Sequence, residues 1–93
     1  MNFDDAAAIV LAELEKEFGG GIRLNDDQII EKPYGWVFFY NTKEFLETGD
    51  PAYALMSNTP FVFTIDGRKF PLRVSCTVED AIAEIEREHS LEG

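Results

Sequence analysis

The sequence predicts a small α+β protein, a single domain over residues 1–93 in which a mainly antiparallel sheet of about four strands lies between an N-terminal and a C-terminal helix. Two observations predict this class. Apolar residues recur at helical spacing near both ends of the chain, and the middle shows the two-residue alternation of strands, punctuated by turn residues. The expected order is α-β-β-α-β-β-α, with a short helical crossover between the two strand pairs.

Residues 3–18 are expected to form an amphipathic helix, because apolar residues recur every three or four positions. Asn2 is a suitable N-cap, and Asp4 and Asp5 favour the positive end of the helix dipole. The glycines at positions 19–21 then end the helix, since glycine adopts left-handed conformations at little cost. They do not resemble a phosphate-binding loop, because they follow a helix and no Lys-Ser/Thr pair comes after them.

The next segment is expected to form the first pair of strands. An extended stretch begins at Ile22, and residues 25–27 carry side chains that hydrogen-bond to local backbone in turns. Residues 28–32 resume the strand. Pro33 then begins a turn into an aromatic strand over residues 36–41, which completes a hairpin.

The aromatic strand is apolar on both faces. Because side chains alternate along a strand, Trp36, Phe38 and Tyr40 point to one face. Val37 and Phe39 point to the other face. Such a strand lies at the centre of a sheet that is covered on both sides, or it reserves its second face for a partner. We expect Trp36 to belong to the core.

Residues 42–58 are expected to form the helical crossover. Thr42 is placed to cap a short helix that ends at Gly49. Asp50 and Pro51 then open another helical turn over the residues that follow, up to residue 56.

A second hairpin and a closing helix complete the predicted fold. Apolar residues alternate from Phe61 to Ile65 and from Phe70 to Val74, and the tight-turn dipeptide Asp66-Gly67 lies between them. The four residues that begin at Thr77 resemble a capping box. The apolar stripe of a closing helix follows, through about residue 89; its members are Val78, Ala81, Ile82 and Ile85.

The charge balance indicates what kind of partner is compatible with the chain. Eighteen acidic residues against eight basic ones give a formal net charge of −10. This charge repels phosphate backbones and favours basic partners, so we expect no binding to nucleic acid. The same acidity would also keep a small protein soluble without any partner, and the composition leaves both interpretations open.

Residues suited to catalysis or metal binding are scarce. Cys76 is the only cysteine and His89 the only histidine, which rules out an internal disulfide and the common zinc patterns. Carboxylate pairs such as Glu13 with Glu17 are expected to be solvated, since no histidine or calcium-loop pattern accompanies them. We therefore expect no enzymatic activity, no cofactor and no metal. An enzyme would require Cys76, His89 and a carboxylate to meet in one pocket.

The sequence also predicts a cytoplasmic location. Acidic residues occupy the N-terminal positions where a signal peptide would be basic. No apolar run approaches the ~20 residues of a membrane-spanning helix, so we expect no membrane partner. A single thiol without a disulfide partner fits a reducing compartment.

Between residues 28 and 89 the chain carries a distinctive combination of residues. They are Tyr34-Gly35-Trp36 at the start of the aromatic strand, Leu46 and Gly49 in the crossover, Ala54-Leu55 before a turn, and Asn58 and Pro60 before the next strand. In this combination the segment resembles the immunity protein 35 family, which includes the YrhB-like proteins of bacteria. The family usually has a G-N-G-P turn where this chain has Ser57-Asn58-Thr59-Pro60.

The resemblance implies a bacterial immunity protein, an antitoxin that neutralises a cognate polymorphic or contact-dependent toxin by stoichiometric protein–protein binding. The partner would be a protein toxin, and the chain would act as a monomer or a homodimer. An acidic contact surface is expected on the polar part of the crossover and on neighbouring turns. The candidate contact residues are Glu31, Tyr34, Glu44, Glu47, Asp50 and Asp66.

The same resemblance leaves a second function open, because YrhB-like proteins are also linked to chaperone-like protection of other proteins against aggregation. A holdase would need exposed apolar surface. The second sheet face, which carries Val37 and Phe39, therefore discriminates between the two functions. Cover by the crossover would favour a specific inhibitor, whereas an open face would favour loose client binding or a homodimer.

Overall fold

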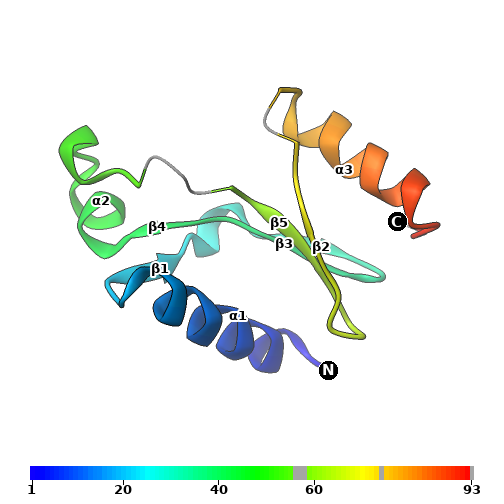
Figure 1. Ribbon diagram of the computed structural model, residues 1–93, viewed down its shortest axis with the longest axis horizontal. Helices are drawn as coiled ribbons and strands as arrows, with labels where there is room; N and C mark the ends of the chain where they lie inside the picture. The colour runs from blue at the N-terminus through cyan, green and yellow to red at the C-terminus, as the bar shows by residue number, and fades with distance from the viewer. Residues whose placement is uncertain (56–58, 74, 93) are drawn as a thin grey trace.

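The computed structural model describes residues 1–55, 59–73 and 75–92, and Figure 1 shows their arrangement. The predicted α+β class is confirmed. In chain order the elements are α1 (Phe3–Phe18), β1 (Ile22–Leu24), the 3-10 turn η1 (Asp26–Gln28), β2 (Ile30–Lys32), β3 (Gly35–Phe38), β4 (Tyr40–Thr42), α2 (Lys43–Thr48), the 3-10 turn η2 (Pro51–Tyr53), β5 (Phe61–Thr64), β6 (Lys69–Pro71) and α3 (Val78–Glu88).

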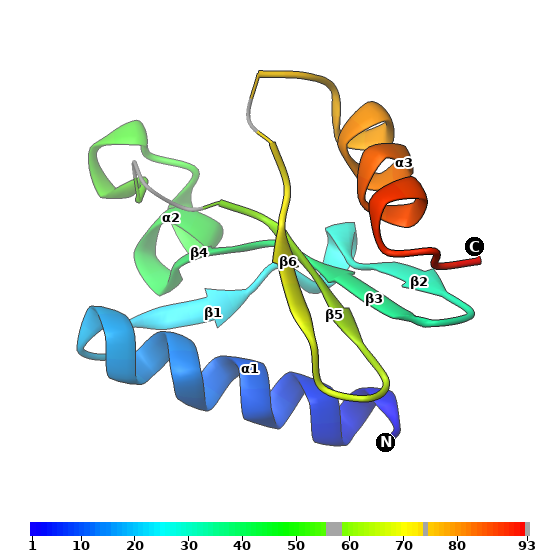
Figure 2. The same cartoon turned by 45° about the vertical axis from the view of Figure 1, so that its right-hand side comes forward.

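The strands form two antiparallel sheets. The larger sheet has the order β2-β3-β5-β6, and β1 pairs with β4 in a separate two-stranded sheet. Figure 2 shows α1 along one side of the larger sheet and α3 along the other, with the two-stranded sheet and α2 extending to one end. The central strands β3 and β5 are thereby enclosed between two helices.

The N-terminal helix has the predicted bounds and caps. The side chain of Asn2 accepts a hydrogen bond from the backbone N–H of Asp5 at 2.8 Å. Gly19 ends the helix in the left-handed conformation, with φ 80°. One face of α1 is buried against the sheet through Ala6, Val10 and Leu14.

The first core lies between α1 and the sheet. Trp36 and Phe38 project from β3 into it, and Phe61 and Phe63 project from β5. The Trp36 side chain is 7% exposed, which confirms its predicted place in the core. Phe3 covers the end of this core, with its ring edge-on to Trp36 at a centroid distance of 6.1 Å.

The second sheet face is also covered, but by α3 and not by the crossover. Val37 and Val62 lie under Ala81, Ile82 and Ile85, which form the buried stripe of the helix. This helix docks there because its apolar stripe needs a matching surface and β3 and β5 present one. The structure therefore presents neither of the two arrangements considered for this face, a face covered by the crossover or an open one.

The aromatic segment 36–41 is not one continuous strand. Strand β3 ends at Phe38, which pairs with Phe61, the first residue of β5. Beyond that point β3 has no neighbour from β5, and Tyr40 pairs instead with Leu24 of β1. The predicted alternation still holds across the break, since Trp36, Phe38 and Tyr40 all lie in the first core.

The crossover has the predicted caps within the part that the structure describes. The Thr42 hydroxyl accepts a hydrogen bond from the N–H of Phe45 at 3.1 Å, and Gly49 ends α2 with φ 73°. The Asp50 carboxylate accepts a hydrogen bond from the N–H of Ala52 at 2.9 Å and begins η2. The end of the predicted crossover at residues 56–58 lies outside the described residues.

The second hairpin and the closing helix are confirmed. Thr77 caps α3 by accepting a hydrogen bond from the N–H of Asp80 at 3.1 Å. Two residues of the predicted apolar pattern face solvent: Ile65, 44% exposed, lies in the turn beyond β5, and Val78, 38% exposed, lies in the first turn of α3. Val74, expected on the return strand, lies outside the described residues.

Candidate functional site

The six candidate contact residues fall into two groups. Glu44, Glu47 and Asp50 lie on α2 and the start of η2. The other three lie on or near the turns of the two hairpins of the larger sheet: Glu31, Tyr34 and Asp66. Figure 1 shows α2 at one end of the long axis and the hairpin turns toward the other end. The structure therefore does not bring the six residues together on one surface.

Glu44, Glu47 and Asp50 form what we call the acidic crossover face. All three side chains are exposed. Glu47 pairs with Arg23 of β1 at 3.6 Å between its Oε1 and the guanidinium, and both side chains of that pair are exposed. An exposed pair of this length contributes little to stability, so its carboxylate stays available to a partner.

The acidic crossover face is held in place by two polar residues of β4. The Thr42 hydroxyl donates a hydrogen bond to the carbonyl of Tyr53 at 2.7 Å. The side-chain oxygen of Asn41, which is only 8% exposed, accepts a hydrogen bond from the N–H of Leu55 at 2.8 Å. These bonds tie the chain after α2 back to the small sheet, so the face is preorganised.

Tyr34 has an internal partner. Its hydroxyl donates a hydrogen bond to Glu86 of α3 at 2.8 Å, and Lys32 pairs with the same carboxylate oxygen at 3.3 Å. Burial raises the pKa of the Tyr34 phenol well above its usual range, and the hydrogen bond to the negative Glu86 raises it further. The visible role of Tyr34 is thus to join the β2–β3 turn to α3, and a contact with a partner stays a prediction.

The Asp66 carboxylate is compensated within its own turn. It accepts a hydrogen bond from the Thr64 hydroxyl and pairs with the Arg68 guanidinium at 3.0 Å. These two interactions, the Thr64 hydrogen bond first, hold the pKa of Asp66 below its usual range. Glu31 is an exposed residue of the edge strand β2, opposite Trp36 in the register.

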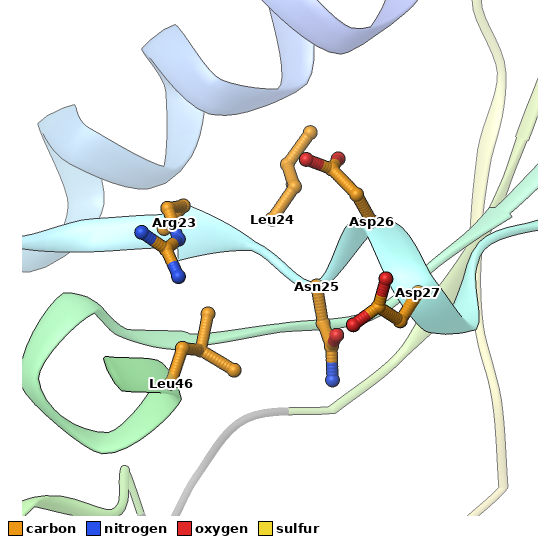
Figure 3. Close-up of a pocket in the computed structure, with 6 residues that line it drawn as sticks. All are labelled: Arg23, Leu24, Asn25, Asp26, Asp27 and Leu46. Atoms are coloured by element: carbon orange, nitrogen blue, oxygen red, sulfur yellow. The ribbon is translucent and has the colours of Figure 1, made fainter. Parts of the chain in front are cut away.

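A hollow of about 300 Å³ lies next to the acidic crossover face (Figure 3). Its lining residues come from β1, the start of η1 and α2: Arg23, Leu24, Asn25, Asp26, Asp27 and Leu46. Figure 3 shows the side chains of Leu24 and Asp26 on the α1 side of β1, and Leu46 rising from α2. The Arg23–Glu47 pair joins the hollow to the acidic crossover face.

The sequence analysis did not identify this hollow. It assigned residues 25–27 to a turn, and the structure places them there. The sequence does not show whether an aspartate in a turn also lines a hollow. The available signal was that two acidic residues, Asp26 and Asp27, follow Leu24 after a single asparagine. That signal becomes specific only when α2 brings Leu46 to the same place.

The structure separates the residues that an enzyme would have needed together. Cys76 precedes α3 and His89 caps its other end, and the 11-residue helix between them is about 16 Å long. His89 stacks on Phe70 with ring centroids 3.9 Å apart. Within residues 1–55, 59–73 and 75–92, no group of three or more His, Cys, Asp or Glu side chains is arranged to hold a metal ion.

Large apolar side chains that remain exposed are scattered along the described part of the chain. They are Met1, Phe3, Ile9, Tyr53, Ile65 and Val78. Isolated residues of this kind are normal on protein surfaces. Among the described helices, none combines the length and the hydropathy needed to cross a bilayer.

The fold and the acidic crossover face define a small α+β protein with a preorganised, negatively charged surface. The model of the family described as immunity protein 35 matches residues 4–88, so this protein belongs to the immunity protein 35 family. The resemblance seen over residues 28–89 is thereby confirmed, and the match also includes most of α1.

A comparison with curated proteins gives a similar result over a shorter segment. The chain is 50% identical over 32 residues to a protein of Escherichia coli (strain K12) described as uncharacterized protein YrhB. The aligned segment covers 34% of this chain and 34% of that relative, so about a third of the relative's length is matched. No solved structure matches the chain significantly.

Proposed function

We propose that this protein is a bacterial immunity protein that neutralises a cognate polymorphic or contact-dependent toxin by stoichiometric binding, and that it catalyses no reaction. The family match over residues 4–88 is the observation that carries the proposal. In this proposal residues 1–93 act as one immunity domain in the cytoplasm, where the toxin would otherwise act. The separation of Cys76 from His89 supports a role without catalysis.

The acidic crossover face suits a partner with a basic or substrate-binding cleft. The net charge of −10 would attract such a partner over a distance and speed association. A preorganised face loses little conformational entropy on binding. We propose that Glu44, Glu47 and Asp50 contact the toxin directly, because all three are exposed and Glu47 pairs with Arg23, which lines a hollow that a partner side chain can enter.

The holdase alternative has no support in the structure. Such a protein would need a broad apolar surface for its clients. Both faces of β3 and β5 are instead packed under helices, α1 on one side and α3 on the other. The exposed apolar residues that remain belong to separate segments.

The proposal is tested by co-expression with a toxin. We expect the gene immediately upstream to encode a long secreted protein, and the candidate toxin is the C-terminal domain of that protein. We expect the wild-type protein to restore growth of cells that express this domain, and the double variant Glu44→Lys with Glu47→Lys to restore it poorly. The reversed charges would repel a basic cleft while leaving the cores untouched.

A matched control is Glu84→Lys with Glu88→Lys on α3. It makes the same change in net charge as the α2 variant. Each variant also breaks one ion pair, since Glu84 pairs with Arg73 at 2.9 Å and Glu47 pairs with Arg23. Rescue by this control but not by the α2 variant would support the acidic crossover face. Equal rescue by both variants would remove that face from the proposal, and a wild-type protein that neither rescues cells nor binds the toxin domain would overturn the function.

A further inference from the structure

A second hollow continues the one in Figure 3 toward α1. It has a volume of about 240 Å³ and lies between α1 and β1. Its lining residues are Ala7, Ala8, Leu11, Arg23, Leu24 and Asp26. Three of these residues, Arg23, Leu24 and Asp26, also line the first hollow, so the two adjoin. We call the combined feature the β1 groove.

The groove exists because of the residues on one flank of α1. The helix buries Ala6, Val10 and Leu14 against the sheet, and Ala7 and Leu11 lie on the flank next to β1. Alanine side chains at positions 7 and 8 are too small to fill the space beside β1. Alanine and leucine side chains therefore line the α1 end of the groove.

The rim of the groove is acidic. Asp26 and Asp27 line its η1 side, and both are exposed. Along α1, Asp4 and Glu15 lie on the same flank as Leu11, seven residues before it and four after it, which is helical spacing. Arg23, the cation that lines both hollows, is paired with Glu47.

We propose that the β1 groove receives a segment of the toxin in which a large apolar side chain is flanked by lysine or arginine. This inference rests on the proposed function and identifies a surface for it. The apolar side chain would enter between Ala8 and Leu24, and the cations would pair with the aspartates at the rim. Charge complementarity of this kind fixes the register of a partner and speeds its association.

The size of the groove agrees with this occupant. Small-molecule sites usually have volumes of about 300–1,000 Å³ and enclose most of the ligand. Taken singly, the hollows of about 300 and 240 Å³ are at or below the lower end of that range, and the α1 end that would hold the apolar side chain is the smaller one. A side chain presented by a folded partner needs only such a shallow pocket, as anchor residues of protein interfaces do.

The substitution Ala8→Trp tests the inference by filling the α1 end of the groove. The probe is the purified upstream toxin domain, titrated calorimetrically into each variant. We expect Ala8→Trp to weaken binding at least about tenfold, because the anchor side chain loses its pocket. The matched control is Ile9→Trp, which places the same side chain about 100° around the helix axis from Ala8 and about 160° from Leu11. It should change the affinity by no more than about twofold.

The double variant Asp26→Asn with Asp27→Asn tests the rim without adding bulk, and it keeps the test valid if Ala8→Trp fails to fold. We expect weaker binding and a smaller decrease of affinity with added salt. Wild-type affinity in both Ala8→Trp and this double variant would overturn the groove and leave the proposed function intact. Absence of binding by the wild-type protein in the same titration would overturn both.

Discussion

Glu86 shows how a single side chain can connect distant parts of this chain. It lies on α3, accepts a hydrogen bond from the Tyr34 hydroxyl and pairs with Lys32. Tyr34 and Lys32 lie at and just before the β2–β3 turn, so the α3 helix is attached to the edge of the sheet as well as to its face. The sequence analysis proposed Tyr34 as a partner contact from its position at a turn, and that contact stays a prediction. The hydrogen bond to Glu86 was not predicted, because a tyrosine beside a turn gives no sign of an internal acceptor 52 residues away.

Replacing Tyr34 with phenylalanine is expected to lower the free energy of unfolding at pH 7 by about 1–2 kcal/mol, since a charge-assisted hydrogen bond to Glu86 is lost in a half-buried place. Urea denaturation would measure this change. A variant as stable as the wild type would show that the hydrogen bond makes no net contribution.

The same variant should differ from the wild type in its response to alkaline pH. Folding raises the pKa of Tyr34 above the unfolded value of about 10, so the stability that its protonated form provides is complete below pH ~10 and declines above it. The phenylalanine variant should therefore lose less stability at high pH than the wild type. It should still lose some, because burial, together with the nearby Glu17, also raises the pKa of Tyr40. If the free energy of unfolding fell with pH equally in both proteins, the alkaline loss of stability could not be assigned to Tyr34.

At the scale of the elements, the sequence predicted correctly those features that depend only on residues close together in the chain. The caps at Asn2, Thr42 and Thr77 were all predicted, because capping needs only a side chain and the backbone three residues ahead. The break after Phe38 was not predicted, since it depends on where β5 begins to pair. Which element covers the second sheet face likewise depends on packing over long sequence separations.

Thr42 allows a test of the crossover as an element. Its hydroxyl caps α2 and also donates to the carbonyl of Tyr53, so Thr42→Val should destabilise the fold by about 1–2 kcal/mol and loosen the acidic crossover face. We expect weaker binding of the toxin domain in calorimetry. Thr77→Val is the control, because it removes the equivalent cap from α3, away from that face. An equal loss of affinity in both variants would mean that only overall stability matters.

At the scale of the whole molecule, the structure places most of its apolar residues in two cores and leaves an acidic surface. The first core lies between α1 and the sheet, and the second lies between the sheet and α3. The charge of −10 was evident from the sequence, but its meaning was not, since an acidic surface serves solubility as well as recognition. The proposal of a recognition role rests on the arrangement of Asp26, Asp27 and the acidic crossover face around the β1 groove.

Association with the toxin domain should therefore depend on ionic strength. We expect the association rate constant to fall about tenfold or more between low salt and ~0.5 M salt, with a much smaller change in the dissociation rate constant. Stopped-flow or surface-based kinetics would measure both constants. A rate constant for association that is insensitive to salt would show that the acidity serves solubility alone.

The position of α3 has a practical consequence for work on this protein. The helix and the C-terminal end of the described chain lie on the side of the larger sheet away from α1, as Figure 2 shows. A fluorescent reporter or an immobilisation tag attached behind α3 would thus leave the β1 groove unobstructed. The same attachment ahead of Phe3 would stand beside the helix that forms one wall of the groove, and assays built that way would report an affinity altered by the label.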